Sequence, residues 1–219
     1  MGTVTIAATY GAGGSLIGPA VAKRLGLPFV DRAIPASLVR KIREPLTAAL
    51  ADDSATRSEV GRLLNSALSY TGLFAGVPIG DEERGVVPDV AHTEVAILRL
   101  AESGGAVILG RAGVFVLKDR PDVLHVRLDG QVEARRRAAM EHEGIDYKQA
   151  SRNQQDIDHA RRAYVSHFYP RAGAWEDSRH YHLVLDSTAL SSDTCVEIIT
   201  RAARDMFARP KSPAPKDQV

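Results

Sequence analysis

The chain has 219 residues, a formal net charge of +1 and 44% hydrophobic residues. This length favours one α/β domain with a full core, and the balanced charge argues against a surface built for nucleic acid. The single cysteine, Cys195, excludes an internal disulfide framework, and no apolar run is long enough for an export signal or a membrane span. We therefore expect a cytoplasmic protein that binds neither nucleic acid nor a membrane.

The first part of the chain predicts a strand, a tight turn and a helix. Residues 4–8 form a short apolar run, and apolar residues recur at helical spacing over residues 15–25. A second strand over residues 27–31 ends in an aspartate. Residues 35–84 are polar, rich in Ala and Ser and interrupted by a proline, which indicates a helical insertion outside the core.

Strands and helices alternate in the rest of the chain. Three further strands are predicted over residues 106–110, 123–128 and 182–186, and three helices over residues 90–101, 131–144 and 194–207. Such alternation predicts a parallel five-stranded sheet with helices on both faces, and ligands bind such sheets at the carboxyl ends of the strands. The Pro-rich tail over residues 209–219 is predicted to be disordered.

The glycine-rich stretch "TYGAGGS" follows the first strand and opens the first helix. On the P-loop pattern G-x-x-x-x-G-K-S/T, the four fixed positions hold Ala8, Gly13, Gly14 and Ser15, so the lysine is missing. The glycines and the helix N-terminus still favour a phosphate, and the Ser15 hydroxyl can serve a phosphate-bound Mg²⁺.

Two other interpretations of this turn remain open. Gly11 and Gly13 supply the start of a dinucleotide fingerprint, with Asp31 at the position of a ribose-binding acid, but Leu16 stands where the third glycine belongs. A plain strand-to-helix turn without a ligand is the other possibility, although three glycines in four positions exceed what a turn requires.

Arginines supply the cations that phosphoryl transfer needs. Arg111 follows the third strand directly and suits a phosphate contact, or it pairs with a nearby aspartate. Arg161 and Arg162 lie on a predicted helix that could act as a lid, although Asp158 and Arg162 have the i,i+4 spacing of an exposed ion pair. The three consecutive arginines over residues 135–137 are interpreted as mostly solvated, although one of them could face the nucleotide. Trp175, Phe168 and Tyr169 are interpreted either as base-stacking residues or as residues of the core or of lid closure.

Taken together, these segments resemble the cytidylate kinase-like branch of the P-loop nucleotide kinases. The resemblance runs through "TYGAGGSLIG", "AVAKRLGLPFVDR", "VILGRAGVFVLKDRPDVLHVRL", "DIDHARRAYVSHFY" and "HLVLDSTALS" in order. It implies a three-layer P-loop kinase-like domain over residues 1–208. Within it, residues 33–89 would bind a nucleoside monophosphate and residues 145–180 would form the lid.

The resemblance also implies roles for single residues, with ATP and Mg²⁺ as cofactors. The loop residues would hold the donor phosphates: Gly11, Ala12, Gly13, Gly14 and Ser15. Arg111, Asp31 and Arg32 would contact the acceptor, and Arg161 or Arg162 would bridge both substrates from the lid. Asp186 and Ser187 would lie near the adenine end of the donor.

The chain departs from authentic cytidylate kinases at three positions. Gly14 replaces the loop lysine, and Leu109 and Ala112 replace two aspartates of the D-G-R-D sequence. The divergent branch resembles this chain in its lysine-free loop, so another cation, among them Lys23, Arg24 or a lid arginine, must substitute if catalysis is fast. The sequence thus predicts a cytidylate-type nucleoside monophosphate kinase, or alternatively a nucleotide-sensing module with little chemistry.

Overall fold

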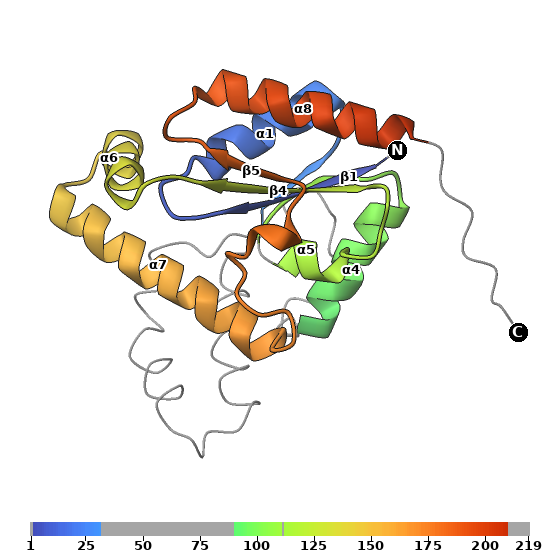
Figure 1. Ribbon diagram of the computed structural model, residues 1–219, viewed down its shortest axis with the longest axis horizontal. Coiled ribbons are helices and arrows are strands. Elements are labelled where there is room, and N and C mark those ends of the chain that lie inside the picture. Colours follow the sequence, from blue (N-terminus) through green and yellow to red (C-terminus); the bar gives the residue numbers. More distant parts are fainter. Residues whose placement is uncertain (1, 32–89, 111, 210–219) are drawn as a thin grey trace, which may run out of the picture.

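A computed structural model describes residues 2–31, 90–110 and 112–209 of the chain (Figure 1). The predicted insertion over residues 33–89 and nearly all of the predicted tail lie outside these ranges, so both stay predictions. Arg32 and Arg111 also lie outside the described residues.

The core of the fold is a parallel sheet of five strands. The strands are β1 (Thr3–Ala8), β2 (Phe29–Asp31), β3 (Val107–Leu109), β4 (Val123–Asp129) and β5 (Leu183–Asp186), in the order β2-β3-β1-β4-β5. Every residue of β1 is buried, which explains its continuous apolar and threonine sequence. All five strands coincide with runs predicted from the sequence.

Helices cover both faces of this sheet and complete the predicted three layers. Helices α1 (Gly14–Leu25) and α8 (Ser192–Ala208) lie on one face, above the sheet in Figure 1. On the other side lie α4 (Val90–Glu102), α5 (Ala112–Val116) and α7 (Tyr147–Phe168), while α6 (Val132–Glu143) lies beyond the end of β4. The short helix α5 was not predicted, and the terminal helix begins two residues earlier than expected.

Local capping explains where the main helices begin and end. Gly13 and Gly26 flank α1, and both adopt positive φ angles. The side chain of Asp146 accepts a hydrogen bond from Gln149 N at the start of α7, and that of Ser191 accepts one from Thr194 N at the start of α8.

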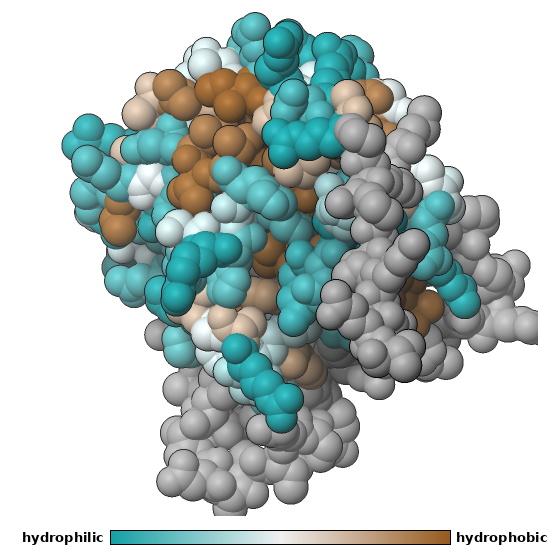
Figure 2. Space-filling view, turned by 45° about the vertical axis from the view of Figure 1, so that its right-hand side comes forward, coloured by the Kyte–Doolittle hydropathy of each residue, from teal (hydrophilic) through white to brown (hydrophobic). Residues whose placement is uncertain are grey.

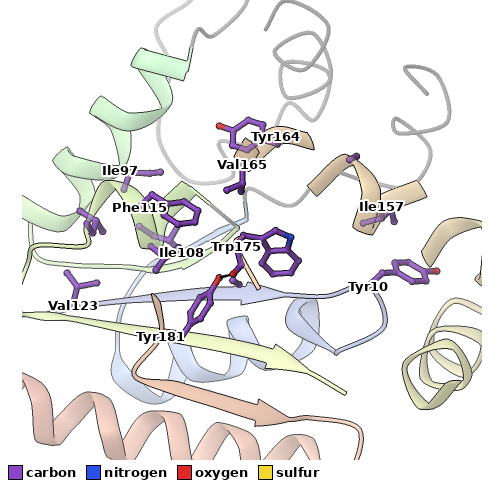
Figure 3. Packing of buried hydrophobic residues seen from close by; sticks show 14 of the residues in the cluster. Tyr10, Ile97, Ile108, Phe115, Val123, Ile157, Tyr164, Val165, Trp175 and Tyr181 are labelled. Carbon is purple, nitrogen blue, oxygen red and sulfur yellow. Dashed lines mark hydrogen bonds between the residues drawn. The ribbon is translucent and has the colours of Figure 1, made fainter. Parts of the chain in front are cut away.

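The layer between the sheet and α7 is built around Trp175, whose side chain is 1% exposed (Figure 3). The Tyr181 hydroxyl donates to the Trp175 carbonyl oxygen at 2.6 Å, and the guanidinium of Arg127 lies 5.4 Å from the indole centroid. Trp175 is therefore a core residue, and its alternative role of stacking on a base is wrong.

Apolar surface is unevenly distributed over the outside of the molecule. In Figure 2 apolar side chains gather in the upper part of the face shown, and hydrophilic ones cover much of the rest that is not grey. The edge strand β5 exposes Val184 to 45%. Among the described residues, no helix combines the length and the apolar character that crossing a membrane requires.

Candidate functional site

The glycine turn lines a cavity of about 400 Å³ at the carboxyl end of β1. We call it the P-loop cavity; its walls come from residues 8–17, the end of β3, α6, α7 and the start of α8. Gly11 and Gly13 hold φ angles of 78° and 69°, which residues with a side chain rarely adopt. The amides of Gly14 and Ser15 belong to the first turn of α1, where N–H groups have no partner within the helix. This cradle suits a phosphate group.

Neighbouring side chains leave little room for a side chain at position 14, where the P-loop pattern has its lysine. A Cβ added at Gly14 would lie 2.8 Å from the Ala8 Cβ and 3.0 Å from Leu109 Cδ1, which is closer than side chains normally pack. Ala8 stands where the P-loop pattern has its first glycine, and Leu109 stands where cytidylate kinases carry an aspartate. Ala8 and Leu109 therefore both lie against Gly14, at the position where a loop lysine would stand.

Arg161 brings a guanidinium to this place from α7. Its Nη1 donates to the Ala8 carbonyl oxygen, and its side chain is only 9% exposed. Burial lowers the pKa of Arg161, and the negative charges of Asp158 and Asp31 oppose this effect. The Arg161 guanidinium thus lies beside Ala8, which packs against Gly14, the position of the loop lysine in the P-loop pattern.

Asp158 ties the glycine turn to two arginines. Its Oδ1 accepts a hydrogen bond from Tyr10 N at 3.0 Å and lies 3.4 Å from Arg161 Nη1. Its Oδ2 accepts from Arg135 Nη1 at 2.9 Å, and the same nitrogen donates to the Tyr10 carbonyl oxygen at 2.9 Å. Because all these groups are buried, the carboxylate compensates charges that would otherwise be costly.

Helix α6 approaches the turn so closely that it requires a glycine. A Cβ at Gly11 would collide with the carbonyl oxygen of Arg135. The Tyr10 hydroxyl donates to Glu143 Oε2 at 2.8 Å and accepts from Asn153 Nδ2 at 3.3 Å. Burial is the main reason that the pKa of Tyr10 rises to about 12, so this phenol stays protonated.

The structure gathers some of the predicted site residues and leaves others apart. Ser15 and Arg161 line the P-loop cavity, as does Ser187, whose Oγ donates to the Ala12 carbonyl oxygen at 2.8 Å. Asp31 lies near Arg161, which feels its charge.

The other two described candidates lie outside the lining of this cavity. Arg162 points away on α7, 58% exposed and 3.5 Å from Glu176 Oε1. The Asp186 carboxylate accepts hydrogen bonds from the Thr188 hydroxyl and from Thr188 N and Ala189 N in its own turn, and these bonds lower its pKa.

One expectation and one alternative about charged residues were wrong. Arg135 and Arg136 are buried rather than solvated, because α6 packs against α7 and the glycine turn. Asp158 pairs with Arg161 and Arg135 rather than with Arg162. The i,i+3 spacing of Asp158 and Arg161 is a signal that the sequence contained, whereas nothing local indicated that Arg135 reaches the turn.

The residues present fit a nucleotide phosphate with its magnesium ion. The cradle has the positive-φ glycines and the free helix amides that phosphates use, and the exposed Ser15 hydroxyl stands at its edge. No cluster of three or more His, Cys, Asp or Glu side chains able to hold a metal ion occurs in the part of the chain that the structure describes. A metal at this site would therefore depend on the ligand's own phosphates.

Three solved structures are similar to this chain, and the first of them supports the fold. An uncharacterized protein from Eubacterium ventriosum ATCC 27560 is 19% identical with a TM-score of 0.62, over 93% of this chain and 99% of that chain. A gluconokinase from Sinorhizobium meliloti 1021 is 17% identical with a TM-score of 0.45, over 95% and 92%. A shikimate kinase from Acinetobacter baumannii is 12% identical with a TM-score of 0.47, over 95% and 96%.

The family comparison covers most of the chain. No protein with a curated description matches the sequence. The cytidylate kinase-like family, in contrast, matches it over residues 3–189, from the first strand through the turn after β5. The chain therefore belongs to the cytidylate kinase-like family.

Proposed function

We propose that this protein transfers the γ-phosphoryl group of ATP, with Mg²⁺, to a nucleoside monophosphate of the cytidylate type or to a related phosphorylated acceptor. The observation that carries the proposal is the buried guanidinium of Arg161 beside the open glycine cradle of α1. Phosphoryl transfer depends on positioning and on cations around the transferred group, and this arrangement supplies both.

Backbone groups would bind the donor. The cradle from Gly11 to Ser15, with Ala12 between its glycines, offers amides to the donor phosphates, and Ser187 fixes the loop through its bond to the Ala12 carbonyl oxygen. Bound Mg²⁺ would neutralise charge that develops between the phosphates, with the Ser15 hydroxyl as a ligand. Asp186 ends β5 and is proposed, on the family resemblance, to lie near the adenine end of the donor.

Arg161 would take over the charge of the missing lysine. In the structure it is held by the Ala8 carbonyl oxygen and Asp158, which keeps the guanidinium in place before substrates bind. Arg162 lies on the exposed side of the same helix and would act only after α7 moves. Asp31, Arg32 and Arg111 are proposed to contact the acceptor, on the family resemblance.

A nucleotide-sensing module is the second candidate function, and one observation favours it. The Asp158 carboxylate already compensates the charge of Arg161. Such a protein would bind ATP without transferring its phosphoryl group. The dinucleotide-binding interpretation is not supported, because β3 separates β1 from β2, whereas dinucleotide-binding sheets place these strands side by side.

An ADP-release assay tests the proposal. Purified protein receives ATP and Mg²⁺ with CMP, dCMP, UMP, AMP or GMP in turn, and calorimetry measures ATP binding on the same sample. Acceptor-dependent ADP would support phosphoryl transfer and name the acceptor. Tight ATP binding without acceptor-dependent ADP across the panel would favour the sensing module.

The cytoplasmic location stays a prediction.

A further inference from the structure

A second cavity, of about 750 Å³, lies between α5, the end of α7 and the segment that leads into β5. We call it the basic cavity; its lining includes Phe115, Lys118, His125, Tyr169, Arg171 and Arg179. None of its lining residues also lines the P-loop cavity, within the part of the chain that the structure describes. The two cavities are therefore separate sites that share only helix α7.

One wall of the basic cavity is an ordered group of rings. Phe115 and Tyr169 stack with centroids 5.1 Å apart, and His180 meets Phe115 edge-on at 5.2 Å. The Tyr169 hydroxyl donates to Glu94 Oε1 at 2.7 Å, which fixes its ring. Such a wall offers apolar, flat surface to a planar ligand.

The rest of the lining is positively charged. It contains Lys118, Arg171 and Arg179, and no aspartate or glutamate is among the described residues that line it. Arg179 is engaged by Asp177, with Nε 3.0 Å from each carboxylate oxygen. Lys118 lies only at 4.0 Å from Asp119, and Arg171 forms no ion pair with any residue that the structure describes.

The histidine at the floor of the cavity adds no positive charge at neutral pH. Burial lowers the pKa of His125 to about 4, and its Nδ1 lies 2.7 Å from the Thr5 hydroxyl oxygen. The charge of the cavity therefore comes from Lys118 and Arg171, whose ammonium and guanidinium groups are the usual partners of phosphate.

We propose that the basic cavity binds a small organic phosphate that carries a planar ring. The ring would lie against the wall of Phe115 and Tyr169, and the phosphate would be held by Lys118 and Arg171. The volume of about 750 Å³ falls within the range of ordinary small-molecule sites. This inference does not depend on the proposed kinase function, because it uses none of the P-loop residues.

Calorimetry on the full chain with phenyl phosphate tests the inference, since this probe joins one flat ring to one phosphate. Inorganic phosphate and phenol represent its two halves. We expect saturable binding of one phenyl phosphate per chain, about tenfold or more tighter than either half. The variant Lys118→Met with Arg171→Gln should weaken binding by about tenfold or more, because both phosphate partners are lost.

A matched control removes the same two kinds of charge elsewhere. Arg201 is exposed on α8, on the opposite face of the sheet (Figure 1), and Lys148 is exposed at the start of α7, far from the end that lines the cavity. Lys148→Met with Arg201→Gln should leave the affinity within about twofold. Absence of saturable binding would overturn the inference. So would binding that survives Lys118→Met with Arg171→Gln but is lost in Arg161→Gln, because the probe would then occupy the P-loop cavity.

Discussion

The arginines near the P-loop cavity are buried and paired with a carboxylate of the protein, whereas Lys118 and Arg171 of the basic cavity are exposed to solvent. Arg161 and Arg135 are buried and share the Asp158 carboxylate, and both also donate to backbone carbonyl oxygens. Arg171 in contrast has no ion-pair partner among the described residues. The first site is preorganised by internal contacts, while the second depends on its ligand for compensation.

This difference in pairing indicates that the P-loop cavity has its side chains in fixed positions before a ligand binds. In the P-loop cavity, the backbone conformation of the glycine turn and the internal ion pairs determine each other through Tyr10 and Asp158. Changes there should affect folding and catalysis together. Changes at the rim of the basic cavity should affect binding alone.

Removal of the shared carboxylate tests this contrast most strongly. Asp158→Ala leaves the buried guanidinium groups of Arg135 and Arg161 without their partner, so we expect a loss of about 3–5 kcal/mol in the free energy of unfolding, measured in urea. Asp205→Ala is the control, because the pair of Asp205 with Arg209 is exposed and worth at most about 1 kcal/mol. Equal losses in both variants would contradict the contrast.

Arg161→Gln should reduce acceptor-dependent ADP formation by about a hundred- to thousandfold. Loss of one preorganised hydrogen-bond donor to the charge that develops in the transition state typically lowers kcat by about this factor. The effect should appear mainly in kcat. Arg152→Gln, on an exposed position of the same helix, serves as the matched control and should retain the rate. Retention of the full rate in Arg161→Gln would remove Arg161 from the site.

The buried histidine of the basic cavity should make stability depend on pH. The pKa of His125 falls from 6.5 to about 4 on folding, so the unfolded chain binds the proton more tightly. Stability is therefore full above pH 6.5 and decreases as the pH falls toward 4, by about 3 kcal/mol in total for this shift. Urea unfolding at several pH values measures this slope.

The variant His125→Gln is the comparison for this pH dependence. It keeps a polar group that can contact the Thr5 hydroxyl but has no titratable proton. We expect the slope between pH 4 and 6.5 to flatten in this variant. An unchanged slope would assign the pH dependence to other groups, such as His182, whose pKa burial also lowers.

Restoring the loop lysine should succeed only if the packing is relieved. Gly14→Lys alone places a side chain against Ala8 and Leu109, and we expect it to cost about 1–3 kcal/mol of stability. Adding Ala8→Gly removes the closest contact and should recover most of this loss. Thermal unfolding measures the stability of both variants. Equal stability of Gly14→Lys and the wild type would show that position 14 has room for a lysine side chain.

Much of the fold followed from the sequence because the three central strands of the sheet are buried on both faces. Its strands are short apolar runs between turn residues, so all five were predicted, with small errors at their ends. Helix α5 was missed because it has only five residues, too few to show a helical period. The insertion could not be assessed in the same way, since residues 32–89 lie outside the described ranges.

The candidate site was predictable only where the backbone makes it. The glycines predicted the tight turn before α1, because the positive φ angles found there favour glycine. The burial of Arg135 and the packing of Ala8 against Gly14 depend on segments that are distant in sequence, so no local pattern could reveal them. The basic cavity escaped prediction for the same reason.

The most direct test of phosphoryl transfer is to follow the γ-phosphoryl group itself. The protein would be incubated with Mg²⁺, γ-labelled ATP and each nucleoside monophosphate, and mass spectrometry would identify the labelled product. We predict a labelled nucleoside diphosphate, most of all with a cytidylate acceptor, and its loss in Arg161→Gln. ATP that binds in the P-loop cavity while the label never reaches any acceptor would contradict the central claim.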